Sequence, residues 1–294
     1  MKDPDTYWHV MTGRWIIAHG DVPRVDVFSH TAAGTPWIDG EWLSQVVMAV
    51  TYDHAGWLGL HALLIACVVA TYAIICTFLM HVYPRWVSAV VSVGAIYFAL
   101  FHLQNMRPHV LAMPLLALWT GLLSQSRGNI WLLCALMVLW ANVHGSFILG
   151  IAIAAGIGYV SMAILAAALA CINPYGYLLY ETVWFQIAYM DVMRQQILEL
   201  RPINAYDDMV QVIGLLVAAA VALWRGTKLG FRRAFTLCTI LFFGLQNRRG
   251  LAFFGVTAPL IVAYSPRFSG SVSIPGRSAL SDLISRFNVH STTE

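Results

Sequence analysis

Two aspartates near the start of the chain, in the stretch MKDPDTYWHV, are the first residues that suggest chemistry. Asp3 and Asp5 flank a proline, and His9 follows Asp5 by four residues. If a helix begins at Asp5, then Asp5 and His9 lie on one of its faces. A carboxylate beside an imidazole can remove a proton from an alcohol, or can hold a divalent cation together with other oxygen ligands. The alternative is that Asp5 caps the helix, a position that Asp favours.

The residues after the acids are predicted to form the helix that positions them. From Thr6 to His19, apolar side chains recur at spacings of three and four, which gives a helix with one apolar face. These side chains are Trp8, Met11, Trp15 and Ala18. Tryptophans on such a face suit the membrane–water interface, because an indole ring has an apolar body and a polar N–H. Gly20 is expected to end the helix, and residues 20–40, rich in Gly, Pro and Asp, to form a loop.

The composition of the chain is that of a membrane protein. Of its 294 residues, 59% are hydrophobic and 11% are charged, whereas soluble proteins carry about a quarter charged residues. A run of about 20 apolar residues crosses a bilayer core, and Trp57–Met80 is such a run. Further, partly shorter, candidate spans are Trp86–Leu103, His109–Ser124, Asn129–Val143, Phe147–Ile172, Met209–Trp224, Ala234–Leu245 and Gly250–Tyr264. The net charge of +3 is small and scattered, which does not indicate a nucleic-acid partner.

Lys and Arg in short loops predict which side each loop faces, because cytoplasmic loops carry an excess of them. The stretch WRGTKLGFRR is the densest basic loop and is placed in the cytoplasm. Residues 173–208 and the acidic residues 1–42 then face the external side. By the same alternation Arg107, Arg248 and Arg249 reach the external face, where guanidinium groups can bind a lipid phosphate bidentately. The alternative is that these arginines bind ordinary lipid headgroups at helix ends.

Residues 147–172 raise a conflict in this topology. Both of their ends are predicted to be external, so the segment has to cross the membrane an even number of times. As a helix its 26 residues span about 39 Å, whereas two crossings need about 60 Å. Three solutions stay open: a re-entrant hairpin that breaks near Gly156–Gly158, residues lost relative to a longer ancestor, or the opposite orientation of one end.

Polar motifs recur in a definite order along the chain. The first is the run DPDTYWHVMTGRWIIAHGDVPRVDVFSHTAAGTPWIDGEWLSQ. The others are RPH at 107–109, WANVHG at 140–145, NPYG at 173–176, LELRP at 198–202 and QNRRGLAFF at 246–254. In this order the motifs resemble those of the GT-C-type membrane glycosyltransferases, in a bacterial branch related to the dolichyl-phosphate-mannose protein mannosyltransferases and the aminoarabinose transferases, and the first run is similar to the first external loop of those enzymes. The resemblance spans roughly residues 3–264.

This resemblance implies a sugar transferase that uses a polyprenyl-phosphate-linked donor at the external face of a bacterial inner membrane. In such enzymes an acid of the first external loop is the general base. It takes a proton from the acceptor hydroxyl, which attacks the anomeric carbon with inversion. The resemblance implies that Asp5 is the first candidate for this base and Asp3 the second, with Glu41 as a further acid near the membrane surface. The substrate-binding residues expected are Trp8, His9, Arg107, His109, His144, Arg201, Arg248 and Arg249. The one cofactor considered is a divalent cation at Asp3 and Asp5, which two carboxylates alone do not specify.

Two further sequence patterns have a structural interpretation as well as a functional one. His144 follows Trp140 and Asn142 at a predicted external helix end, where it is either a site residue or an interfacial histidine with a backbone partner. Asn173-Pro174-Tyr175-Gly176 predicts a turn that ends one helix and caps the next.

Two other functions remain open. A non-catalytic membrane protein that binds or transports a lipid or solute would need polar groups deep within its spans and an inverted repeat, and few charges fall within the spans here. A truncated, inactive relative is the third alternative, because family members carry a membrane helix before the acidic pair and only Met1–Lys2 precede it in this sequence.

The sequence therefore predicts an all-α, polytopic integral membrane protein with about seven or eight hydrophobic helices and an interfacial amphipathic helix. Residues 1–42 are predicted to be an external, periplasmic loop, and residues 43–264 a helical membrane domain with the external loop 173–208. Residues 265–294 are predicted to be a polar cytoplasmic tail.

Overall fold

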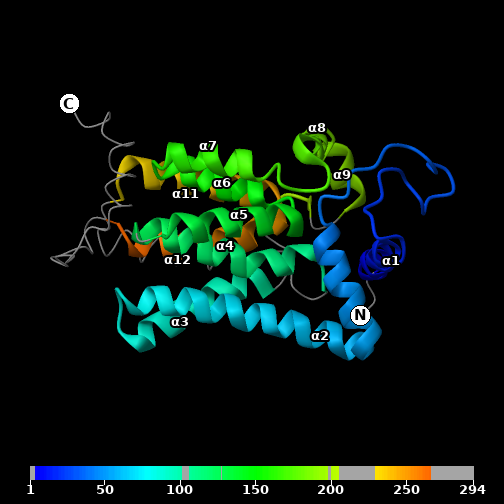
Figure 1. Ribbon diagram of the computed structural model, residues 1–294. Helices are drawn as coiled ribbons and strands as arrows, with labels where there is room; N and C mark the ends of the chain where they lie inside the picture. The colour runs from blue at the N-terminus through cyan, green and yellow to red at the C-terminus, as the bar shows by residue number, and fades with distance from the viewer. Residues whose placement is uncertain (1–3, 101–105, 127, 198–199, 205–228, 266–294) are drawn as a thin grey trace.

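The computed structural model describes residues 4–100, 106–126, 128–197, 200–204 and 229–265 (Figure 1). Within these residues the chain forms eleven α-helices, one short 3-10 helix and no named strand, which confirms the predicted all-α class. The elements are α1 Pro4–His19, α2 Trp42–Met80, α3 Arg85–Leu100, α4 Pro108–Gln125, α5 Ile130–Val143, α6 Phe147–Gly156, α7 Val160–Leu169, the 3-10 helix Gly176–Leu178, α8 Leu179–Ala188, α9 Met190–Gln196, α11 Phe231–Gln246 and α12 Arg248–Ala263.

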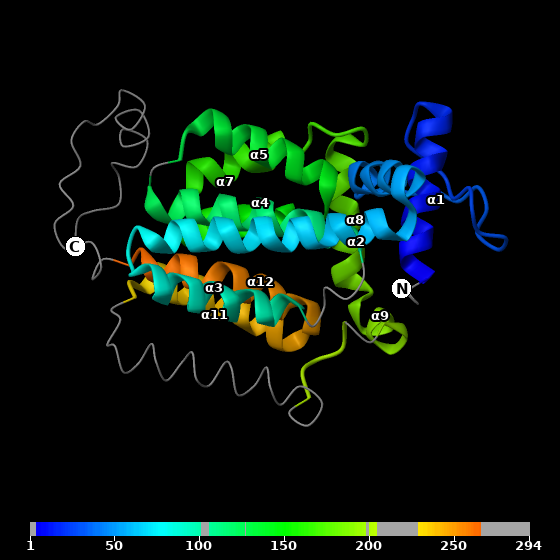
Figure 2. The same ribbon diagram turned by 90° about the horizontal axis from the view of Figure 1, so that it is seen from below.

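The longer helices lie side by side in a bundle, and the helices outside the bundle lie at one end of it (Figures 1 and 2). Helices α1, α8 and α9 all lie at this end, which we call the α1 end. The chain repeatedly returns to it, because α4, α6 and α12 begin there and α5, α7 and α11 finish there. The segments that the sequence predicts to be external, 1–42 and 173–208, therefore share one end of the molecule in their described parts.

A kink at Gly56 divides α2 into two pieces. Gly56 has φ 56° and ψ −146°, a conformation that residues with a Cβ avoid. Before the kink, α2 runs across the α1 end beside α1; after it, the helix runs along the bundle (Figure 1). The second piece begins at Trp57, which agrees with the predicted apolar run Trp57–Met80.

The segment 147–172 folds as a helical hairpin. Helix α6 ends at Gly156 and α7 begins at Val160, with Gly158 between them at φ 108°. The two helices pack against each other and bring both ends of the segment to the α1 end. The segment therefore forms a hairpin that breaks near Gly156–Gly158, and its predicted re-entrant course in a membrane stays a prediction. Each arm has 10 residues, or about 15 Å of helix.

Helix length alone does not establish the predicted seven or eight membrane spans. By length and composition, one described helix, α2, is long and apolar enough to cross a membrane, and a buried helix of a soluble protein would pass the same test. The other apolar helices in the described part of the chain have 10 to 17 residues. The candidate span Met209–Trp224 lies outside the described residues, as do residues 266–294 of the predicted tail 265–294.

Two tryptophans lie in the core of the bundle, and each of their indole N–H groups has a hydrogen-bond acceptor. Trp119 and Trp140 are fully buried with their ring centroids 6.5 Å apart. Trp119 donates to the carbonyl of Gly150 at 2.9 Å, and Trp140 to the hydroxyl of Ser146 at 3.0 Å. These bonds fix α4 and α5 against the start of α6, and so they hold the residues of the α1 end in register.

Helix α1 agrees with its predicted position, but it packs through a different face. The side chains of Trp8 and Met11 are exposed, whereas Thr6, Val10 and Ile16 are buried. Gly13 allows this contact, because a Cβ there would lie 2.0 Å from the carbonyl oxygen of Gln45 on α2. The exposed Trp8 thus lies outside the buried face of α1.

Candidate functional site

Asp5 and Arg107 form an ion pair at the α1 end. Asp5 lies in the first turn of α1, and its Oδ2 atom is 3.1 Å from Nη2 of Arg107. The Arg107 side chain is 13% exposed and that of Asp5 is 57% exposed, so the pair reaches solvent through the carboxylate. The sequence alone placed these residues 102 positions apart on one predicted face of a membrane. The structure brings them into direct contact.

Local structure explains how Arg107 is presented to Asp5. Pro108 opens α4, and the residue before a proline favours an extended backbone. Arg107 accordingly has φ −133° and ψ 160°. The buried Thr6 hydroxyl donates to the carbonyl of Met106 at 3.2 Å. Thr6 and Asp5 therefore fasten the first turn of α1 to the two residues that precede α4.

A second polar contact joins Glu41 to His144. Glu41 precedes α2 but makes no capping hydrogen bond with its side chain. Its Oε1 atom instead lies 3.1 Å from Nε2 of His144, which ends α5. The other ring nitrogen of His144 accepts the backbone N–H of Ser146 at 2.9 Å. Because Nδ1 is an acceptor, neutral His144 carries its proton on Nε2 and donates it to Glu41. His144 therefore combines both sequence alternatives: it has a backbone partner, and it contacts a predicted site acid.

His9 belongs to a third group of contacts. Its Nδ1 atom is 3.3 Å from the side-chain nitrogen of Gln45, and the same nitrogen is 3.0 Å from Oδ1 of Asp39. Asp39 also accepts the backbone N–H of Glu41 at 3.3 Å. The start of α2 is thus tied to α1 and to the end of the preceding loop.

Four side-chain contacts and three short stretches of chain connect seven residues, which we call the polar ring. It runs through Asp5, Arg107, His109, His144, Glu41, Gln45 and His9. Some steps cross between elements, including the edge-on contact of the His109 and His144 rings at 6.2 Å. The other steps follow the chain, over two residues at the start of α4 and four residues on α1 and on α2. Most of the candidate residues predicted from the sequence therefore meet at one place.

Asp39 is the residue that sequence reasoning missed. It is 4% exposed, although the sequence places it among Gly and Pro in a loop. Burial raises its pKa to about 7, even though hydrogen bonds from the Glu41 backbone and from Gln45 act in the opposite direction. Its Oδ2 atom is buried with no hydrogen-bond partner. The sequence around Asp39 carries no signal of this burial.

Hydrogen bonds within the 20–41 loop and to the 173–176 turn hold this loop in place. Asp26 accepts the backbone N–H groups of Phe28 and Ser29 at 2.9 and 2.8 Å, and together with the Ser29 hydroxyl these bonds lower its pKa. Tyr175 donates its hydroxyl to the carbonyl of Pro23 at 2.7 Å, and burial raises its pKa. Arg24 donates to the carbonyl of Pro174 at 3.3 Å. The loop is thereby fastened to the 173–176 turn, where Asn173 makes the predicted turn contacts with Tyr175 and Gly176.

Trp8 takes part in a group of three aromatic rings on the outer side of α1. Its ring centroid lies 5.0 Å from that of Phe28 and 6.1 Å from that of Trp37. The three rings meet edge to face or tilted, so they pack α1 against the loop. Trp8 is exposed, and it lies three residues from Asp5 on the same helix.

The other predicted arginines gather on a different part of the α1 end. Arg201 donates to the carbonyls of Arg194 and Gln195 at 3.2 and 3.3 Å. The backbone N–H of Arg248 donates to the carbonyl of Arg201 at 3.1 Å. Arg194, which the sequence analysis did not select, donates to the carbonyl of Gln246 at 3.0 Å. The segment after α9 and the α11–α12 turn therefore form a second basic group. The side chain of Arg249 lies outside the described residues.

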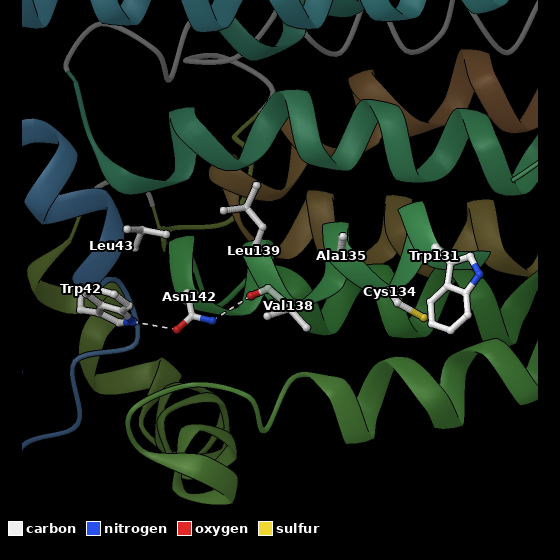
Figure 3. A pocket seen from close by; sticks show the side chains of 8 residues that line it. All are labelled: Trp42, Leu43, Trp131, Cys134, Ala135, Val138, Leu139 and Asn142. Carbon is white, nitrogen blue, oxygen red and sulfur yellow. Dashed lines mark hydrogen bonds between the residues drawn. The ribbon is translucent and has the colours of Figure 1, made fainter. Parts of the chain in front are cut away.

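An open apolar groove begins beside the polar ring. It has a volume of about 640 Å³ and lies along one face of α5, next to the start of α2 (Figure 3). Its lining residues are Trp42, Leu43, Trp131, Cys134, Ala135, Val138, Leu139 and Asn142. At its end near the ring, the Trp42 indole donates to Asn142 at 2.8 Å, and Asn142 donates to the carbonyls of Val138 and Ile172. Glu41 and His144 are one and two residues away from these two side chains.

The predicted cation site is only partly covered by the structure. Asp3 lies outside the described residues, and Asp5 faces the cationic guanidinium of Arg107. Among the described residues, no three His, Cys, Asp or Glu side chains are grouped so that they could hold a metal ion. A cation at Asp3 and Asp5 stays a prediction.

Comparison of the chain with protein-family models, with curated proteins and with solved structures found no match.

Proposed function

We propose that this protein is a membrane glycosyltransferase of the GT-C type. It would move a sugar from a polyprenyl-phosphate-linked donor to an acceptor hydroxyl, with inversion, at the external face of a bacterial inner membrane. The observation that carries the proposal is the 3.1 Å contact between Asp5 and Arg107. This contact puts a proton acceptor and a phosphate-binding group in one place, and the rest of the polar ring surrounds it.

The outer surface of the bundle supports a membrane location. Large apolar side chains are exposed on five of its helices: Leu58 on α2, Trp86 on α3, Trp131 on α5, Ile164 on α7 and Phe231 on α11. Single exposed apolar residues are common in soluble proteins, but a bundle that exposes them on many helices suits a lipid environment. Polar and charged groups instead lie toward the two ends of the bundle: the polar ring is at the α1 end, and Arg85, Arg232 and Arg233 lie at the starts of α3 and α11. These features favour a polytopic arrangement with the α1 end at one surface of the bilayer.

The geometry of inversion assigns complementary tasks to Asp5 and Arg107. In an inverting displacement the attacking and leaving oxygens lie on opposite sides of the anomeric carbon. The base serves the attacking oxygen, and the guanidinium group stabilises the phosphate that leaves. Because Asp5 and Arg107 are in contact, the donor sugar has to enter between them and part the pair. Donor phosphate would replace the carboxylate on Arg107, so that binding of the donor releases the base.

The apolar groove supports a lipid-linked donor in particular. From Trp131 to Asn142 it follows 12 residues of α5, about 16 Å. Its lining is almost entirely apolar, and its polar end adjoins Glu41 and His144. A hydrocarbon chain in the groove would place its phosphate near the polar ring. The same groove favours the second candidate function, lipid binding without group transfer.

The decisive experiment measures transfer of a labelled sugar from a polyprenyl-phosphate donor by the purified full-length protein in proteoliposomes. We expect Asp5→Asn to lower the rate by about 100-fold or more, because a general base contributes 10²–10⁴-fold. The matched control is Asp53→Asn, which removes the other carboxylate that pairs with an arginine at α1. Its rate should remain within about twofold of the wild type, since Asp53 pairs with Arg14 on the exposed side of the helix.

Equal rates for the wild type and Asp5→Asn would remove Asp5 as the base. If the wild type binds the donor but transfers no sugar to any acceptor alcohol, the transferase proposal falls and lipid binding takes its place.

A further inference from the structure

The end of the bundle opposite the α1 end holds an arginine where three helices meet. Arg233 lies in the first turn of α11, and α4 and α12 finish at the same end (Figure 1). Its Nη1 group donates to the carbonyl of Ile261 on α12 at 3.2 Å, and its Nη2 group to the carbonyl of Ser124 on α4 at 3.4 Å. Arg233 is half-buried between these helices. One guanidinium group therefore joins α11 to the ends of α4 and α12.

The positive charge of Arg233 is not matched by a negative one in the described part of the chain. Three other arginines each pair with an aspartate: Arg14, Arg107 and Arg194. The described hydrogen-bond partners of Arg233 are two neutral carbonyl groups. Burial lowers its pKa, and the phenol of Tyr159 acts in the opposite direction. Because arginine stays charged in proteins and withdrawn charges are normally paired, this environment suits an anion.

Helix ends account for only part of the arrangement. The last four carbonyl groups of a helix have no partner within it and carry the negative end of its dipole. Ile261 and Ser124 both lie in such a last turn, so Arg233 satisfies one carbonyl of each helix. These bonds leave donors over, because a guanidinium group has five N–H groups. The Nε–H group has no partner among the described residues, and its nitrogen is not enclosed, so a ligand can reach it.

Ser124 adds a second group that lacks a partner. The residue is 4% exposed, and its hydroxyl oxygen is buried with no hydrogen bond among the described residues. Other buried hydroxyls in these helices donate to the carbonyl four residues before them, as those of Ser92 and Thr257 do. The Ser124 hydroxyl belongs to the same residue as the carbonyl that accepts from Arg233. An anion held by Arg233 would supply the acceptor that this hydroxyl lacks.

We propose that Arg233 and Ser124 bind a phosphate group at this end of the bundle. Guanidinium N–H groups match phosphate oxygens in geometry, and the serine hydroxyl would donate to a further oxygen. The phosphate comes either from the headgroup of an anionic lipid or from a free phosphate ion, since both present the same oxygens. Arg85 and Arg232, at the starts of α3 and α11, add positive charge that attracts anionic headgroups.

This site is separate from the polar ring, which lies at the α1 end. Its task is to stabilise the bundle, because the phosphate would bridge residues of α4 and α11 that meet only in the folded protein. A ligand that binds only the folded state raises the temperature of unfolding.

The test measures thermal unfolding of the purified full-length protein in detergent micelles, in two series. One series adds inorganic phosphate, with sodium chloride of equal ionic strength as the reference. The other adds phosphatidylglycerol, with an uncharged galactolipid as the reference. We expect at least one series to raise the Tm of the wild type above its reference by about 3 °C or more at saturation. A rise with the lipid alone identifies a headgroup, a rise with inorganic phosphate alone identifies a free ion, and a rise with both identifies a site open to either source.

Three variants locate the response. Arg233→Gln should abolish it, whereas Arg85→Gln, which removes an exposed arginine from the same end, should keep it. Ser124→Ala decides the matter if Arg233→Gln folds poorly, because its hydroxyl makes no described hydrogen bond that the fold could lose. Without ligand it should unfold at the wild-type temperature or slightly above, and it should need about tenfold more ligand for the same rise in Tm.

The proposal is overturned if neither series raises the Tm of the wild type above its reference. It is equally overturned if Arg85→Gln loses the response as fully as Arg233→Gln, since the effect would then be one of overall charge. A Ser124→Ala protein that responds at the same ligand concentrations as the wild type would also contradict it.

Discussion

Helix α1 carries two ion pairs, and they differ in how far water reaches them. Asp5 pairs with Arg107, whose side chain is 13% exposed, whereas Arg14 pairs with Asp53 and both of their side chains are about 40% exposed. Arg14 also lies over the ring of Tyr52 at 5.4 Å, and its hydrogen bond to Asp53 raises its pKa. The same two residue types thus meet in two settings on one helix. The difference teaches that pairing by itself does not distinguish the proposed site: the two ion pairs differ in how deeply the arginine is buried.

Arg107→Gln should separate the two ion pairs most clearly, because it should lower the rate of sugar transfer the most. If Arg107 stabilises the phosphate that leaves, its loss should lower transfer by about 100- to 1,000-fold, the usual effect of removing one transition-state donor. Arg14→Gln is the matched control and should change the rate by less than about twofold. Initial rates at varied donor concentration measure both. Similar losses in the two variants would show that the pairs are equivalent and that neither binds the donor.

Asp39→Asn should remove a pH dependence of stability. The carboxyl group has an ordinary pKa of 3.8 when unfolded and about 7 when folded. The folded state therefore holds an extra proton between these values, so stability is full below about pH 4, falls as the pH rises and levels off above about pH 7. A shift of about three units corresponds to roughly 4 kcal/mol at most. Thermal unfolding in detergent from pH 4 to 8 should show this fall in the wild type and not in the variant. A parallel fall in both would assign the dependence to another group.

Gly13→Ala should disturb both ion pairs together. A Cβ at this position would lie 2.0 Å from the backbone oxygen of Gln45, so α1 has to move away from α2. Overpacking of this kind costs about 1–3 kcal/mol, and unfolding by heat should show it. Gly94→Ala on α3 meets nothing within 4 Å and should be neutral or slightly stabilising. If both variants unfold alike, the close approach of α1 and α2 is not what positions the site.

Asp53→Asn should have the smallest effect. Exposed pairs contribute about 0–1 kcal/mol, and salt screens them. We therefore expect a loss of stability below about 1 kcal/mol that shrinks further in high salt. The measurement is thermal unfolding at low and high salt for Asp53→Asn and the wild type. A large, salt-independent loss would mean that the outer pair is as important to the fold as the inner one.

Helices were the part of the structure that local patterns predicted well. Apolar runs and glycine breaks act on residues close to them in the chain. The sequence therefore predicts α1 and α3–α5. It also predicts the α6–α7 hairpin, as one of three alternatives for residues 147–172. The packed face of α1 could not be predicted in this way. The tryptophans give the stronger apolar pattern, but Gly13 permits the approach to α2, and its partner lies 32 residues further along the chain.

In the candidate site, too, residues recognisable by type and motif were predicted, and residues that depend on distant contacts were not. Asp5, Arg107, Glu41 and His144 were selected by residue type and by motif order, and the structure brings them into one ring. Asp39 was not selected, because its burial depends on the loop being covered by the 173–176 turn, more than 130 residues away. Contacts of that separation leave no trace in the local pattern around Asp39. Gln45 was not selected for the same reason: it is a single amide side chain among the apolar residues that begin α2.

The bend at Gly56 separates two kinds of sensitivity within one helix. The residues that α2 buries against the polar ring and α1 are Ser44, Gln45, Met48 and Ala49, and all precede the bend; the later ones, from Gly59 to Leu79, line the bundle. A genetic screen of α2 should therefore divide at this glycine. Substitutions upstream should affect the proposed sugar transfer together with stability, whereas substitutions downstream should affect stability alone.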